Sequence, residues 1–180
     1  MTEIKQNCEY KMENVLSVRN KMTQQEIQQT LIDMGNTLNT LGAKKNGPLV
    51  TTTLGVEQTA EGPVLDMEIL IPLDKEVDVP PPYIFKKLFH LKYAVYARHE
   101  GNPQLLQKTL NEMMKYIQEN KLTQITSVYS VNIKELKQKV AHKKNVRLKQ
   151  NNQKLVTDIG KYDYSFLCRI FLSKKGNFYA

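Results

Sequence analysis

Apolar residues follow two different periods along this chain, and the order of the two periods occurs twice. A strand pattern within residues 9–20 leads into a helix pattern that starts at the capping box of Thr23 and Glu26 and ends at Gly42. Within this helix, apolar residues recur at steps of three and four, which places them on one face. They are Ile27, Leu31, Met34, Leu38 and Leu41. A helix with such a face has to pack on a sheet.

Two extended segments after this helix predict a β-hairpin. Residues 48–53 and 64–72 flank residues 59–62, whose sequence Thr-Ala-Glu-Gly is typical of a turn. Alternate residues of the second arm face opposite sides of a sheet, so one side is apolar and the other is mixed. The mixed side carries Asp66, Glu68 and Leu70.

The same order of patterns returns after a proline-rich stretch at residues 74–86, which we interpret as a stiff connection between two halves. A strand pattern over residues 91–98 is followed by a predicted turn over 99–101. A helix with one apolar stripe then begins at Asn102 and Pro103. The rest of this half is predicted to comprise a strand over 124–133, a basic insertion over 134–154 and a strand over 161–172.

The repeated order predicts an α+β fold of duplicated strand-helix-strand-strand halves, which form one antiparallel sheet with two long helices on one face. We place the pseudo-repeats at residues 9–73 and 87–172 of a single domain over 1–180, because 180 residues bury one good core. The seam between the halves predicts a groove on the sheet face that the helices leave uncovered.

Composition narrows the class of protein. Apolar residues make up 41% of the chain, yet they form no run long enough to span a membrane, and the N-terminal residues lack the order of a secretory signal. We therefore expect a cytoplasmic protein. The two cysteines, Cys8 and Cys168, form no Cys-x-x-Cys pair, so we expect no zinc site. The sequence also has no Gly-rich phosphate loop, so we expect no cofactor.

The net charge of +8 is concentrated in one segment. Eight basic residues and one acidic residue lie between Lys134 and Lys154, which leaves +1 for the rest of the chain. This basic insertion could be an amphipathic arm that binds a partner. We favour the alternative that it is a solvated insertion without a binding role. Nucleic acid is not the expected partner, because no aromatic residues interleave with the charges. The candidate arm residues are Lys137, Lys143, Lys144 and Arg147.

Three groups of residues invite a chemical interpretation. His99 and Glu100 could act as acid and base, although adjacent strand-end residues usually point apart. Two carboxylates on one strand face, Asp66 and Glu68, are more often a solvated face with ion-pair partners than a catalytic pair. Tyrosines on the predicted strands fit a ligand pocket, a partner interface or plain packing, and we leave these open. They are Tyr96, Tyr129, Tyr162 and Tyr164.

Three sequence features together resemble the GyrI-like ligand-binding domains, which are also the effector domains of MerR-type multidrug-sensing regulators. They are Gly47-Pro48 before the hairpin, the strand of residues 66–72 that ends in proline, and Tyr93-Ala94-Val95-Tyr96 ahead of His99-Glu100-Gly101. The resemblance implies a Glu-x-Tyr pair on the strand after the second helix, whose carboxylate meets cationic ligands. The matching residues here are Ser127-Val128-Tyr129, so the acid is missing and we do not expect a sensor of lipophilic cations.

We predict a non-catalytic binding module without metal or cofactor. The preferred occupant of the groove is a protein partner, such as a secreted toxin or a secretion component that this chain escorts as an accessory protein or chaperone. The alternatives are a small-molecule sensor that binds a small hydrophobic ligand and a GyrI-like hydrolase that depends on Glu68 or Tyr129. The predicted groove residues are Glu68, Tyr96, Ser127, Tyr129 and Tyr164.

Overall fold

The structure of the chain is a computed structural model that describes residues 2–101, 105–133 and 166–175, with the backbone alone for Gly101 and for the last segment. The predicted basic insertion with its arm residues, the helix start at Asn102 and Pro103, and the side chains of Tyr162 and Tyr164 lie outside the described residues.

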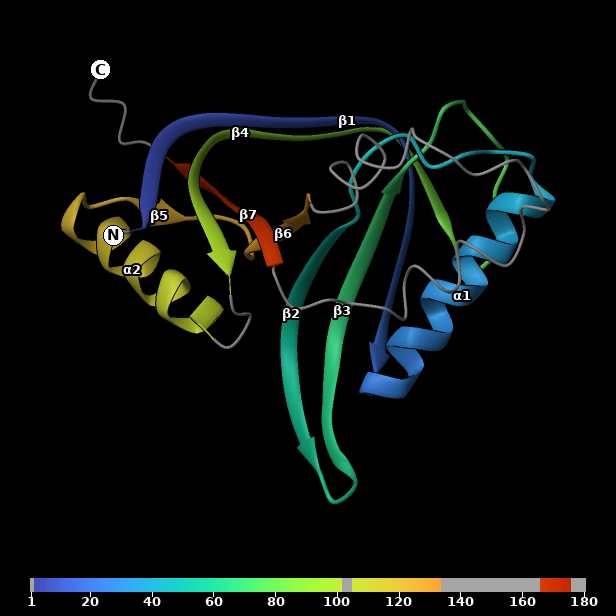
Figure 1. Cartoon of the computed structure of the whole chain (residues 1–180), viewed down its shortest axis with the longest axis horizontal. Coiled ribbons are helices and arrows are strands. Elements are labelled where there is room, and N and C mark those ends of the chain that lie inside the picture. Colours follow the sequence, from blue (N-terminus) through green and yellow to red (C-terminus); the bar gives the residue numbers. More distant parts are fainter. Residues whose placement is uncertain (1, 102–104, 134–165, 176–180) are drawn as a thin grey trace, which may run out of the picture.

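The described elements confirm the predicted α+β class, with two helices and antiparallel strands (Figure 1). Their order is β1 (Glu3–Met22), α1 (Gln24–Thr40), β2 (Val50–Thr59), β3 (Gly62–Pro72), β4 (Ile84–Gly101), α2 (Leu106–Glu119), β5 (Thr123–Gln124), β6 (Tyr129–Asn132) and β7 (Phe166–Lys175). None of the described helices combines the length and the apolar character that a membrane crossing requires.

The sheet closes on itself, which the sequence did not predict. Its strand order is β4-β1-β3-β2-β6-β7-β5, and β4 also pairs with β7, so six strands form a closed circuit of pairings. The halves contribute equivalent sets, β1-β3-β2 and β4-β7-β6, and they meet at β1–β4 and at β2–β6. The predicted duplication is therefore present, with two seams in place of one.

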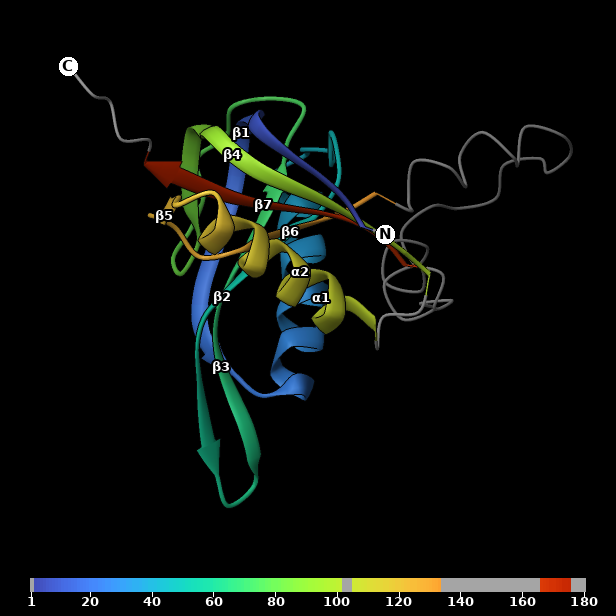
Figure 2. The same ribbon diagram turned by 90° about the vertical axis from the view of Figure 1, so that its left-hand side faces the viewer.

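The long strands β1 and β4 change which face they present along their length. Met12 and Val15 both lie in the inner apolar cluster although an odd number of positions, three, separates 12 from 15, and the same holds for Leu91 and Ala94. Asn14 and Tyr93 have φ values of 52°, in the left-handed region, and each lies between two such residues. Irregular residues of this kind reset the alternation of a strand. Figures 1 and 2 show the resulting bends.

Helix α1 forms where the sequence predicts it. The Thr23 Oγ1 atom accepts a hydrogen bond from the Glu26 backbone N–H at 3.4 Å, and the Glu26 carboxylate accepts one from the Thr23 backbone N–H at 2.7 Å. Gly42, with φ of 60°, follows the last turn. The apolar face of the helix packs on β1 and β3, through Leu31, Met34 and Leu38 against Leu16, Val18, Ile69 and Ile71.

Both helices cover the outer face of the closed sheet. Met113 and Ile117 of α2 pack on Val95 and Ala97 of β4, which alternate with inward-facing residues such as Ala94. The inner face has its own cluster, to which both halves contribute. Its buried members are Met12, Val15, Val50, Leu70, Phe89, Leu91, Ala94 and Val131. The outer part of the β2–β3 hairpin projects from this body (Figures 1 and 2).

The predicted turn at residues 99–101 is wrong. Strand β4 continues through Gly101, because pairing with β7 runs on to Gly101 and Phe166. The predicted strand over 124–133 is divided into β5 and β6. Long-range pairing overrides the local turn preference of glycine here.

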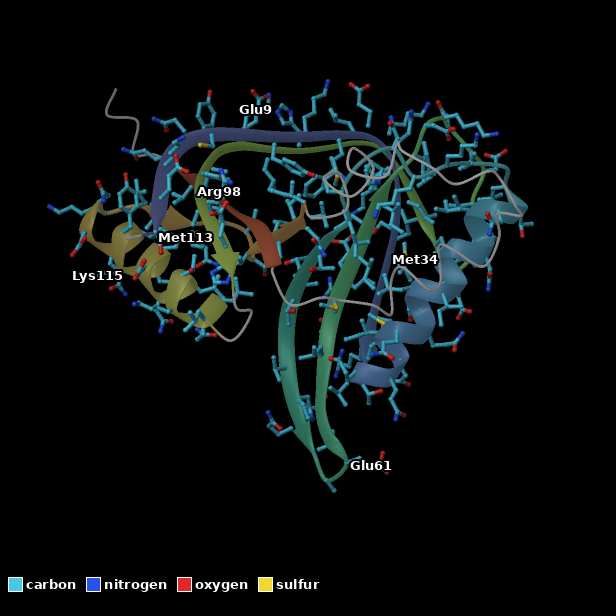
Figure 3. The ribbon with its side chains drawn as sticks, viewed as in Figure 1. Glu9, Met34, Glu61, Arg98, Met113 and Lys115 are labelled. Atoms are coloured by element: carbon cyan, nitrogen blue, oxygen red, sulfur yellow. The ribbon has the colours of Figure 1, made fainter. Side chains whose placement is uncertain are left out.

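We expect the α1 contact to dominate the stability of the first half. Met34 is fully buried against the sheet, whereas Met114 on α2 is 37% exposed, and both helices are seen in Figure 3. Met34→Ala should therefore lower the free energy of unfolding by about 2–5 kcal/mol. Met114→Ala should change it by under about 1 kcal/mol. Urea denaturation of both variants checks this, and equal losses would contradict the packing described.

Candidate functional site

The register of the strands aligns a row of residues across the inner face. Arg19 pairs with Glu68, Glu68 with Thr52, and Thr52 with Tyr129. The row continues through the backbone of Phe171 to Tyr96. Residues directly opposite each other on neighbouring strands project from the same face. We call Arg19, Glu68, Thr52, Tyr129 and Tyr96 the inner row; polar residues come from the first half and tyrosines from the second.

Glu68 is held by two partners from two other strands. Its Oε1 accepts a hydrogen bond from Ser17 Oγ at 2.5 Å and forms an ion pair with Lys86 Nζ. The side chains of Glu68 and Lys86 are 13% and 31% exposed. The neighbouring Asp66 forms a two-point contact with Arg19 at 2.7 and 2.9 Å. The predicted ion-pair partners are therefore confirmed, but Glu68 is largely buried and not solvated.

Tyr129 interacts electrostatically with the carboxylate of Glu68. Burial raises the pKa of the Tyr129 phenol, and the negative charge of Glu68 raises it further. The ring of Tyr129 packs edge-on against Phe89, with centroids 5.1 Å apart. Tyr96 packs against the same inner cluster. Three of the predicted groove residues, Glu68, Tyr96 and Tyr129, thus share one face.

Thr52 was missed by the sequence analysis. It is 2% exposed, and its Oγ1 has no hydrogen-bond partner among the described residues. A buried hydroxyl without a partner is costly, and such groups are rare in folded proteins. Thr52 lies in the sequence Thr51-Thr52-Thr53, a run that is ordinary for a strand and gives no local signal of a site.

The other two predicted groove residues are not part of the inner row. Ser127 is half-buried in the segment just before β6, two residues before Tyr129. Tyr164 lies outside the described residues. The acid that acts on Tyr129 is Glu68 of β3. It comes from the first half of the chain, whereas Ser127 lies in the second half.

A pocket of about 310 Å³ opens at one edge of the inner face. Tyr10 and Met12 of β1, Gly47 and Pro48 before β2, and Val131 of β6 line it. We call it the rim pocket. Its volume is at the lower end of the range for small-molecule sites. The paired residues Leu70, Val50 and Val131 form a buried layer between this pocket and the inner row.

A larger pocket, of about 510 Å³, lies between α2 and the end of β4. His99 is buried there, with its Nδ1 2.8 Å from Thr109 Oγ1. Glu100 is exposed and pairs with Arg98. Adjacent residues of a strand face opposite sides, so His99 and Glu100 do not form an acid–base pair. Within the described part of the chain, no cluster of acidic, histidine and cysteine residues could hold a metal ion.

The closed sheet with two outer helices is a fold that this chain shares with EcmrR. The chain covers 97% of the crystal structure of the EcmrR C-terminal domain, with a TM-score of 0.57 and 12% sequence identity. In the cryo-EM structure of the EcmrR–DNA complex in EcmrR-RPo, 97% of this chain matches 57% of that chain, with a TM-score of 0.62 and 15% identity. The chain thus spans just over half the length of that protein.

No protein-family model and no curated protein matches the sequence. The likeness to EcmrR is one of fold, and it agrees with the fold that the sequence resemblance implies.

The electrostatic interaction between Glu68 and Tyr129 predicts a change in the pKa of Tyr129. Glu68→Gln should lower the pKa of Tyr129 towards its ordinary value, because the substitution removes a negative charge that disfavours the phenolate. Glu61→Gln, at the tip of the hairpin (Figure 3), should leave this pKa unchanged. Titration of ring-labelled tyrosine by NMR measures both. An unchanged Tyr129 pKa in the Glu68→Gln variant would show that the charge of Glu68 does not act on Tyr129.

Proposed function

We propose that this chain is a non-catalytic domain that binds a small, mainly apolar molecule on the inner face of its closed sheet. The observation that carries this proposal is the inner row. It places Tyr129 beside Thr52, whose hydroxyl is unpaired, and near the largely buried Glu68, and it places a second partly exposed tyrosine, Tyr96, further along the same row. Apolar and aromatic walls with a few placed polar groups are typical of small-molecule sites.

The fold likeness to the EcmrR C-terminal domain supports this proposal. It agrees with the small-molecule sensor implied by the GyrI-like resemblance, and it gives no support to the escort of a toxin or secretion component. EcmrR is seen in a complex with DNA, and a DNA-linked role for this chain would need a part equivalent to the rest of EcmrR.

The hydrolase alternative finds less support in the same residues. A general base needs a carboxylate that is free to take a proton in the reaction. The Oε1 atom of Glu68 is instead engaged by Ser17 and by Lys86. If the chain were such a hydrolase, Glu68→Gln would abolish turnover of hydrophobic esters.

Binding of a neutral fluorescent probe such as N-phenyl-1-naphthylamine tests the proposed function. Tyr129→Ala should weaken binding about tenfold, because it removes an aromatic wall of the inner row. Tyr10→Ala is the matched control, because Tyr10 lines the rim pocket and is not in the row. Thermal melting of both variants confirms that they are folded.

The opposite pattern, in which only Tyr10→Ala weakens binding, would place the ligand in the rim pocket. No binding of apolar probes by the wild-type protein would overturn the proposal.

A further inference from the structure

Three strands converge on the carboxylate of Glu68. Glu68 lies on β3, Ser17 on β1 and Lys86 on β4, and both partners contact the same oxygen atom, Oε1. Ser17 is buried, and Lys86 is about two-thirds covered. Partial burial weakens the competition from water for such an ion pair, so the pair is firmer than one on the open surface.

The acids near Glu68 are also neutralised within the chain. The strands β2 and β3 carry three acidic residues, and each one has a basic partner on a neighbouring strand. Glu57 pairs with Lys21 at 2.9 Å, Asp66 with Arg19 at 2.7 Å, and Glu68 with Lys86. The acidic residues of β2 and β3 therefore offer no unpaired charge to a ligand.

Thr52 supplies a hydrogen-bond donor for a ligand on the same face. Its buried Oγ1 lies at the register position between Glu68 and Tyr129, and no described residue satisfies it. A hydroxyl can donate one hydrogen bond. A ligand with an acceptor oxygen next to an apolar body would satisfy Thr52 without disturbing the ion pair.

We propose that Lys86 determines the ligand class of this site: as a built-in counter-ion of Glu68, it excludes lipophilic cations and leaves Thr52 to select neutral ligands with a hydrogen-bond acceptor. The proposal rests on the proposed function, since it concerns what the same inner face binds. A cation would have to displace Lys86 from Glu68 before it gained a counter-charge, whereas a neutral ligand would not.

Two probes of nearly equal shape separate charge from size. Triphenylphosphine oxide is neutral and carries an acceptor oxygen, and methyltriphenylphosphonium carries a methyl group and a positive charge in its place. Isothermal titration calorimetry with the full chain should show binding of the oxide and at least about tenfold weaker binding of the cation.

Lys86→Met should invert this preference. The substitution keeps most of the apolar stem and removes the charge, so Glu68 becomes available and affinity for the phosphonium should rise by about tenfold or more. The double variant Lys86→Met/Glu68→Gln should lose the gain. Lys87→Met is the matched control, because Lys87 is exposed and pairs with Glu76, and it should behave like the wild type.

Thr52→Val gives an independent readout that does not depend on the ion pair. The valine has the same shape without the hydroxyl, so affinity for the oxide should fall by about fivefold or more. The midpoint of thermal unfolding should stay equal or rise, because no hydrogen bond is lost in the free protein.

The outcomes separate this proposal from the proposed function. If the wild-type protein binds the phosphonium as tightly as the oxide, the role of Lys86 is overturned and small-molecule binding stands. The same holds if folded Lys86→Met shows no gain for the cation, or if Thr52→Val binds the oxide normally. If the wild-type protein binds neither these probes nor N-phenyl-1-naphthylamine, the proposed function itself fails.

Discussion

The pairing of β1 with β4 is the contact on which the rest of the fold depends. It runs from Glu3 and Arg98 to Ser17 and Ile84, and it joins the first strand of each half. The second seam, between β2 and β6, has only three paired positions in the described residues. The long seam holds the halves in a fixed register, and the closed circuit of strands follows because β4 also pairs with β7.

Closure of the sheet removes polar groups of the inner face from water. A sheet that is closed and covered outside by two helices buries residues on both of its faces, so polar groups inside need partners from the protein itself. Glu68 has Ser17 and Lys86, and Asp66 has Arg19. The contacts with Ser17 and Arg19 follow from the pairing of β3 with β1, whereas the contact with Lys86 of β4 also requires the long seam. Thr52 is the inner-row group that this network leaves without a partner.

The sequence predicts local features of this structure well. The capping box of Thr23 and Glu26 acts over three residues, and Gly42 ends the helix through its own backbone freedom. The alternation in β3 also predicts correctly that Glu68 and Leu70 share a face, because alternation depends only on neighbouring residues. Both kinds of signal are contained in short windows of sequence.

The arrangement of the site could not be predicted in the same way. Ser17 and Glu68 are 51 residues apart, and which residue meets which depends on the register of β1 against β3. The irregularities at Asn14 in β1 and Tyr93 in β4 change the face that each of these strands presents. A regular strand pattern therefore assigns the wrong face to residues beyond them. Thr52 was missed because the run Thr51-Thr52-Thr53 gives no local signal of a site, and the continuation of β4 through Gly101 was missed because it depends on pairing with β7. Lys86 had been assigned to the proline-rich connection, whereas β4 already begins at Ile84.

The acid and the tyrosine of this site come from different halves of the chain. The resemblance implies an acid beside Tyr129 on the strand after the second helix, where this chain has Ser127. Glu68 reaches the neighbourhood of the same tyrosine from the first half, across Thr52. An acid on β3 lies beside β1, and Lys86 of β4, the next strand beyond β1, forms an ion pair with it. A largely buried carboxylate without a counter-ion would destabilise the empty site, since desolvation disfavours its charged form. With Lys86 in place, Glu68 has its counter-ion before any ligand arrives, and the fold does not depend on a ligand to neutralise this carboxylate.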